Sequence, residues 1–185
     1  GEESHMAPEH ADAFVNALIQ AQDAPSTLFQ LLPEDIIWAE AGRILTDQDL
    51  VYNAGVTLVQ AISEGLDRIV DIGGAIRALA LALRPFTYSL IYHYAQAAVL
   101  AYADHWDSGT ADRFFDLFKT GYRQNYVDGN QHVAVLALHG LTMLGILRYD
   151  MRLHNKALGL LLSDFPAIPE EPDVPAPLAC AALHM

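Results

Sequence analysis

The segment Val133 to Leu147, VAVLALHGLTMLGIL, constrains the fold of this chain more than any other stretch. Its 15 residues include no charge, and only His139 and Thr142 carry polar side-chain atoms. A surface helix has one apolar stripe, whereas this segment is apolar on every side, so protein or lipid must surround it. Because a helix needs about 20 residues to cross a bilayer, the shorter segment favours burial within protein. It therefore predicts the central helix of an all-α protein.

Helical periodicity extends over most of the remaining sequence. Apolar residues recur every three or four positions, and prolines, glycines and the turn sequence Asp-Gly-Asn separate the periodic stretches. No strand pattern is convincing, because each apolar run continues beyond the length of a strand. The predicted helices cover residues 8–22, 27–32, 33–45, 46–72, 75–83, 86–106, 111–125 and 133–147, with a last short helix ending near residue 162.

These elements predict a single-domain helical bundle, or a stack of α-hairpins, around the central helix 133–147. Gly73-Gly74 is expected to end the helix 46–72, and Leu153 to Asn155 to separate the central helix from the last one. Residues 1–6 resemble an expression remnant, residues 7–165 form the all-helical domain, and residues 166–185 form a Pro-rich acidic tail. We expect this tail to add little to stability, with Leu178 to Met185 either docked as a short helix or loose.

Negative charge is concentrated in the first part of the sequence. Residues 1–71 contain 13 acidic and two basic residues, whereas residues 72–185 contain ten acidic and eight basic ones. A field of this sign repels nucleic acid and acidic lipid and attracts basic proteins. If the acidic residues served solubility alone, this would explain the negative sign of the net charge but not its uneven distribution along the chain. We therefore expect a basic protein partner, and neither a nucleic acid nor a membrane.

The polar face of the predicted helix 46–72 is the candidate surface for that partner. Polar residues recur along it at helical spacing, opposite the apolar face. Only Arg68 offers a nearby positive charge to its acidic end. We expect this face to point to water and to bind the partner through Glu64, Asp67, Asp71, Asn53 and Gln60.

Tyrosines and histidines suggest an alternative function. Tyr88, Tyr92 and Gln96 recur on one side of the predicted helix 86–106, with His93 beside them. Together with His139 of the central helix they would line a small-molecule pocket, which makes the chain a helical ligand-binding protein or an enzyme. Tyrosines that pack in the core and hydrogen-bond a backbone carbonyl explain the same pattern. A third alternative is an adaptor that presents the Pro-rich tail to a groove.

The sequence lacks the motifs of several enzyme and metal-binding classes. Beyond residue 6 it contains no Glu-x-x-His, and it contains no His-Glu-x-x-His, Walker loop, Gly-x-Gly-x-x-Gly or Gly-x-Ser-x-Gly. His132 and His139 are two helical turns apart, too far to share one metal, and are expected to be hydrogen-bonded core residues. His93 and Asp104 also lack chelating spacing. We expect no catalytic residue, no metal and no cofactor.

The single cysteine, Cys180, excludes a disulfide within the chain and a Cys-rich metal site. No basic n-region followed by an apolar run marks a secretory signal. Tyr88, Tyr92 and Tyr94 make the least charged long stretch, residues 85–103, too polar for a lipid span. These features predict a cytoplasmic protein, and they leave its oligomeric state open.

One stretch resembles a known family. Residues 135–153, VLALHGLTMLGILRYDMRL, followed by LLSDFP and a proline-broken end, are similar to the C-terminal part of the helical immunity proteins of bacterial polymorphic-toxin systems, the Imm49-like group. The resemblance rests on an apolar helix that ends in Arg-Tyr-Asp, and no functional residue is carried over. It implies a catalytically inert protein that caps a toxin. We therefore expect a non-catalytic protein-binding module, an immunity or antitoxin-type inhibitor of a basic partner such as a toxin.

Overall fold

The computed structural model describes residues 8–46, 52–85 and 87–165. These residues form nine α-helices, three 3-10 helices and no strand, so the predicted all-α fold is confirmed. The predicted expression remnant at residues 1–6 and the Pro-rich tail at residues 166–185 lie outside the described residues. The chain divides into two compact units, which meet in sequence between Ala82 and Leu83.

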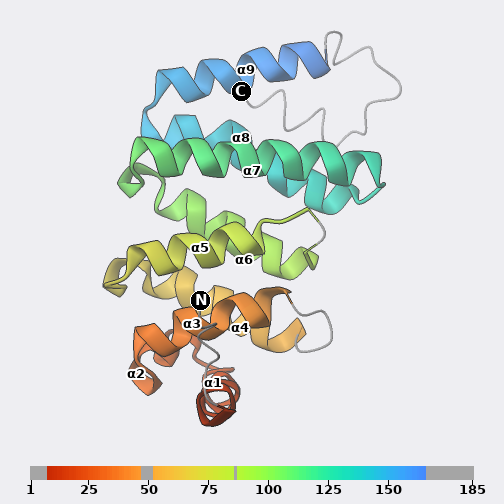
Figure 1. Ribbon diagram of the computed structural model, residues 1–185. Helices are drawn as coiled ribbons and strands as arrows, with labels where there is room; N and C mark the ends of the chain where they lie inside the picture. The colour runs from red at the N-terminus through yellow and green to blue at the C-terminus, as the bar shows by residue number, and fades with distance from the viewer. Residues whose placement is uncertain (1–7, 47–51, 86, 166–185) are drawn as a thin grey trace, which may run out of the picture. The chain divides into compact units, whose positions relative to one another are not determined.

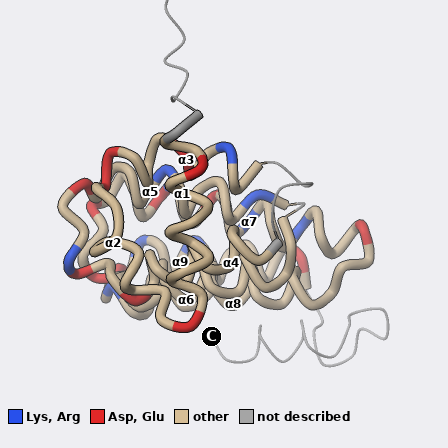
Figure 2. Tube along the Cα trace, turned by 90° about the horizontal axis from the view of Figure 1, so that it is seen from below, with Lys and Arg blue, Asp and Glu red and all other residues tan. Residues whose placement is uncertain are grey.

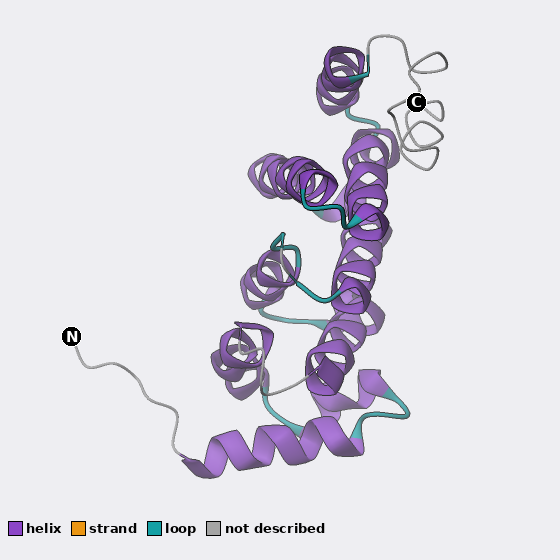
Figure 3. Ribbon diagram, turned by 90° about the vertical axis from the view of Figure 1, so that its right-hand side faces the viewer, coloured by secondary structure: helices purple, strands orange, loops and turns teal. Residues whose placement is uncertain are grey.

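The first unit is a layered arrangement of helices around an apolar core. Helices α3 and α5 lie side by side, α4 contacts both of them, and α1 packs against α3 and α4 at the end of the unit (Figures 1 and 3). Phe14, Ile37 and Leu58 are among the fully buried side chains that fill the space between these layers. The elements are α1 (Pro8–Gln20), η1 (Pro25–Thr27), α2 (Leu28–Leu31), α3 (Glu34–Thr46), α4 (Tyr52–Gly65), η2 (Leu66–Arg68) and α5 (Ile72–Ala82).

The prediction of a single helix over residues 46–72 is wrong. Helix α4 ends at Gly65, one 3-10 turn follows, and α5 begins at Ile72. Gly74 therefore lies in the first turn of α5 and does not end a helix. A Cβ atom at Gly74 would lie 2.4 Å from the Trp38 ring, so glycine lets α5 approach α3 this closely. Sequence alone could not separate a terminating glycine from one that serves close packing.

The second unit is centred on α8, as the sequence predicted. Helix α8 contacts α6, α7 and α9, and half of its residues, including Leu138, Leu141 and Leu144, are buried. Glycines let its neighbours approach: a Cβ at Gly145 would lie 2.6 Å from the His154 amide nitrogen of α9. The elements of this unit are α6 (Ser89–Ala101), η3 (Ala103–His105), α7 (Ser108–Val127), α8 (Gln131–Arg148) and α9 (Met151–Asp164).

Two predicted boundaries in this unit are also wrong. The aromatic helix expected over residues 86–106 is shorter: α6 covers Ser89–Ala101, and a separate 3-10 turn follows. The break expected at residues 153–155 falls instead at Tyr149, whose backbone is left-handed with φ 56°. Asp150 then caps the start of α9, because its side chain accepts a hydrogen bond from the Leu153 amide at 3.2 Å.

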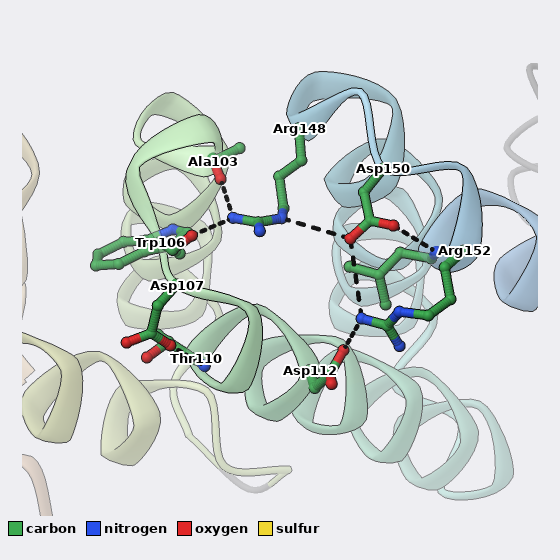
Figure 4. Close-up of polar contacts among 9 residues, drawn as sticks. Ala103, Trp106, Asp107, Thr110, Asp112, Arg148, Asp150 and Arg152 are labelled. Atoms are coloured by element: carbon green, nitrogen blue, oxygen red, sulfur yellow. Dashed lines mark hydrogen bonds and ion pairs between the residues drawn. The ribbon is translucent and has the colours of Figure 1, made fainter.

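Arg148 joins the end of α8 to the corner before α7 (Figure 4). Its Nη1 donates to the carbonyl oxygen of Ala103 at 2.8 Å and also to that of Trp106. Its side chain is nearly buried, and its Nε lies 3.9 Å from the Asp150 carboxylate. Arg148, Tyr149 and Asp150 therefore lie where α8 ends and α9 begins.

Candidate functional site

The acidic residues predicted as one stripe lie on three different elements. Glu64 is in the last turn of α4, Asp67 is in η2, and Asp71 precedes α5. All three are exposed, as expected. Figure 2 shows the acidic positions along the trace as separate red segments and not as one continuous band. The three carboxylates therefore do not share one helical face.

Two of these carboxylates hold the backbone of the first unit. Glu64 accepts a hydrogen bond from the Ser26 amide at 3.2 Å, which ties the end of α4 to η1. Asp71 accepts the Gly74 amide at 3.0 Å and so caps the start of α5. Its other oxygen lies 3.9 Å from the Arg77 guanidinium. Charge reversal at these two positions would disturb the fold as well as any interface.

Sequence analysis missed a third acid with a structural function, Glu34. Its carboxylate accepts the Val70 amide at 2.9 Å and the Asp71 amide at 3.0 Å, and it also accepts the Trp38 indole N–H at 3.2 Å. The first turn of α3 thereby fixes the bend between η2 and α5. A position in the first turn of a helix indicates by itself only a favourable interaction with the helix dipole. No local signal shows that a residue 36 positions away supplies the donor.

The polar side chains at the start of α4 lie elsewhere, in a groove between α1 and α4. Asn53 is exposed on its wall, whereas Thr57, one turn later, is buried. Gln60 is half-buried. The expectation that this face of α4 points to water is therefore wrong at Thr57, because α1 covers it. The groove has a volume of about 250 Å³ and is lined by Val15, Leu18, Ile19, Gln22, Asn53, Ala54 and Thr57.

One apolar side chain that lines this groove is exposed, and two acidic residues lie close in sequence to the lining residues of α1 and the turn after it. Ile19 is 60% exposed. Asp12 lies one turn before Val15 along α1, and Asp23 directly follows Gln22. Both aspartates are exposed and have no ion-pair or hydrogen-bond partner within the ranges that the structure describes. Their charges remain available to a ligand on this side of the unit.

The five residues of the predicted small-molecule pocket do not form one wall. Tyr92 and Gln96 are buried in the second unit, whereas Tyr88, His93 and His139 are exposed. His93 contacts its neighbour Tyr94 edge to face, with ring centroids 5.5 Å apart. Because two of the five residues are buried and three are exposed, they do not line one shared pocket.

The histidines of α8 are also placed differently from the prediction. His132 and His139 are both exposed, so they are not hydrogen-bonded core residues. Their helix is less uniformly enclosed than its sequence indicates, since one stripe of it reaches the surface. Among the described residues, no group of three or more His, Cys, Asp or Glu side chains lies close enough to hold a metal ion. The absence of a metal in the purified protein stays a prediction.

Comparisons with protein-family models, curated proteins and solved structures found no match to this chain. No described helix has the length and apolarity needed to cross a membrane. The groove between α1 and α4, together with the exposed acidic residues near it in sequence, is therefore the candidate site on physical grounds alone.

Proposed function

We propose that this chain is a non-catalytic, cytoplasmic protein-binding module that captures a basic protein partner through its first unit. The observation that carries the proposal is the groove between α1 and α4, lined by the exposed Ile19, with Asp12 and Asp23 near it in sequence and without a partner among the described residues. An apolar centre with a charged rim is the usual anatomy of a protein-binding surface. Such a site favours a partner that inserts an apolar side chain and places lysine or arginine alongside it.

The distribution of charge along the chain supports a positively charged partner. Acidic residues strongly outnumber basic ones in residues 1–71, and the balance is nearly even afterwards. Glu34, Glu64 and Asp71 engage backbone donors, so part of this charge serves the fold. Asp12, Asp23 and Asp67 do not have that function in the described structure, and they retain their attraction for a basic surface.

Within this class, we propose an immunity or antitoxin-type inhibitor of a basic toxin. The resemblance of residues 135–153 to Imm49-like immunity proteins favours this assignment. Proteins of this kind act by covering a partner, so they need a complementary surface and no catalytic group. The chain's acidic first unit is compatible with such a basic target.

Affinity capture at two salt concentrations tests this proposal. The purified chain is immobilised, incubated with extract of its source cells at low and at high salt, and the retained proteins are identified. We expect a basic protein that associates more slowly with the chain as salt rises, because salt screens exposed charges. A specific partner that is acidic, or whose association is insensitive to salt, would contradict the proposed surface.

A further inference from the structure

Helix α9 buries one face and leaves an apolar face exposed. Leu153, Ala157 and Leu161 pack into the second unit and are buried. Met151, Leu158 and Leu162 are 65%, 39% and 58% exposed. Residues 151, 155, 158 and 162 follow helical spacing, so these side chains form one stripe with Asn155 between them. We call this set, Met151, Asn155, Leu158, Gly159 and Leu162, the outer stripe of α9.

Gly159 shows that the outer stripe has room for a close neighbour. A Cβ atom at this position would meet nothing within 4 Å. By contrast, a Cβ at Gly140 or Gly145 would meet a neighbouring element at less than 3.0 Å. Glycine in the middle of a helix destabilises it relative to alanine. The described packing therefore gives no reason for glycine at 159, whereas a segment that crosses α9 at this point would.

We propose that residues 178–183 of the same chain, Leu-Ala-Cys-Ala-Ala-Leu, pack on the outer stripe of α9. Two leucines would cover its exposed apolar side chains, and the small residues between them would allow close approach over Gly159. This inference is independent of the proposed partner surface, which lies in the first unit.

The connecting chain is long enough for this contact. Residues 166–177 supply 12 residues between Phe165 and Leu178, and at up to about 3.3 Å per residue they reach about 40 Å. Helix α9 has 14 residues, so at about 1.5 Å per residue it is about 21 Å long. Residues 178–183 can therefore reach any point of the stripe from the end of α9.

A second copy of the chain fits the same stripe less well. One face of α9, about 21 Å long and about 10 Å wide, offers about 200 Å². A stable interface between proteins buries about 800 Å² on each partner. A tethered segment does not need so large an area, because its effective concentration at the stripe is in the millimolar range. The size of the face therefore favours residues 178–183 as its occupant.

Disulfide formation by Cys180, the chain's single cysteine, provides the test. A second cysteine is introduced in the full-length chain as Asn155→Cys, on the outer stripe. The matched control is Gln124→Cys, at an exposed position of α7. This position is close to the end of α9, because the guanidinium of the adjacent Arg123 lies 3.3 Å from the Asp164 carboxylate. Both variants are oxidised at low protein concentration, and the intramolecular disulfide is followed on non-reducing gels and by mass spectrometry. Circular dichroism checks that both are folded.

We expect Asn155→Cys to form the intramolecular disulfide at least about tenfold faster than the control, since docking raises the local concentration of Cys180 at the stripe. Adding Leu178→Ser and Leu183→Ser to Asn155→Cys should lower its rate to that of the control. Equal rates for the two single variants would overturn the proposal. A rate that is unaffected by the leucine substitutions would also overturn it, because proximity would then come from the tether alone. Disulfide-linked dimers in place of the internal disulfide would assign the stripe to a second copy.

Discussion

The Tyr92 hydroxyl lies in the space left by the absent side chain of Gly121. A Cβ atom at Gly121 would be 2.4 Å from this oxygen. Tyr92 is fully buried, and its hydroxyl has no hydrogen-bond partner within the described part of the chain. Burial raises the pKa of Tyr92 well above its ordinary value, so the hydroxyl stays neutral. Glycine at 121 thus accommodates a polar group that gains no hydrogen bond from the fold.

Replacing Tyr92 with phenylalanine should therefore stabilise the protein. The change removes a buried oxygen that lost its water on folding, and it keeps the ring that fills the core. We expect the free energy of unfolding to rise by about 1 kcal/mol, measured by urea denaturation followed by circular dichroism. A loss of stability would show that the hydroxyl has a partner in solution.

Gly121→Ala provides the second half of a double-mutant cycle. With Tyr92 present, the added methyl group must displace the hydroxyl, and overpacking of this kind costs about 1–3 kcal/mol. With Tyr92→Phe the nearest remaining atoms are 3.3 Å away, and the better helix propensity of alanine partly offsets the strain. The cost of Gly121→Ala should therefore be smaller in the Tyr92→Phe background. Equal costs in both backgrounds would show that the two residues are not coupled.

Glu34→Ala should loosen the bend between η2 and α5. The substitution leaves the Val70 and Asp71 amides and the Trp38 indole without their acceptor. Hydrogen bonds to a charged group contribute about 1.5–3 kcal/mol, and because two of these three are exposed we expect a loss near the lower end, about 1.5 kcal/mol. Asp35→Ala is the control, because Asp35 accepts only the amide of the next residue. Hydrogen exchange at Val70 and Asp71 should accelerate in the Glu34 variant alone.

Aspartate substitutions in α8 should destabilise the protein more on the enclosed side of the helix than on its outer side. Leu144 is fully buried, so Leu144→Asp places a charge in a dry site at a cost of several kcal/mol and should give unfolded or insoluble protein. Leu136 is half-buried, and the same change there should leave a folded protein with a lower melting temperature. The uniformly apolar sequence of residues 133–147 does not distinguish the two positions. Equal damage in thermal melts would show that Leu136 is covered in solution.

The contrast between Leu136 and Leu144 shows where sequence reasoning succeeds and where it ends. The length and apolarity of residues 133–147 were enough to predict a central helix, because few other environments accept such a segment. They could not show which stripe of the helix reaches the surface, since that depends on helices packed from other parts of the chain. The predicted stripe Asn53 to Asp71 failed for the same reason. The apolar and polar periodicity continues across Gly65, where α4 ends, and the hydrogen bond from the Val70 amide to Glu34 then fixes the bend before α5.

Asp107 should make the second unit sensitive to acid. Hydrogen bonds from the Thr110 backbone lower the pKa of the Asp107 carboxyl below its ordinary value, and the Thr110 amide is 2.7 Å away at the start of α7. A carboxyl whose pKa is lower in the folded state stabilises the fold above its unfolded pKa of about 3.9 and loses this contribution as pH falls through the folded value. Asp107→Asn retains a capping side chain without the charge.

Urea midpoints at pH 7 and at pH 3 would measure this effect. We expect the wild type to lose more stability than Asp107→Asn between these two values. If the two proteins lose the same amount, the lowered pKa of Asp107 does not contribute to the acid sensitivity of the fold.

Charge reversal at the groove should test the proposed partner surface without disturbing the fold. Reversing Glu64 and Asp71 would remove the acceptor of the Ser26 amide and the cap of α5, so lost binding there would be ambiguous. Asp12→Lys with Asp23→Lys alters only exposed side chains that have no partner within the described residues. The control is Asp104→Lys with Asp128→Lys, which changes the net charge equally in the second unit and gives up one surface contact, between Asp104 and the His105 Nδ1 at 2.8 Å.

We expect the reversal at Asp12 and Asp23 to weaken binding of the captured basic partner by at least about tenfold, or about 1.4 kcal/mol. Most of this loss should be in the association rate, and it should diminish as salt rises, because charges at a rim mainly steer encounter and are screened beyond about 8 Å at physiological salt. Surface plasmon resonance at several salt concentrations measures both quantities. The control should bind within a few-fold of the wild type, since its charges are remote in sequence from the groove. If the two variants bind equally well at low salt, net charge alone governs the association, and the groove between α1 and α4 is not the interface.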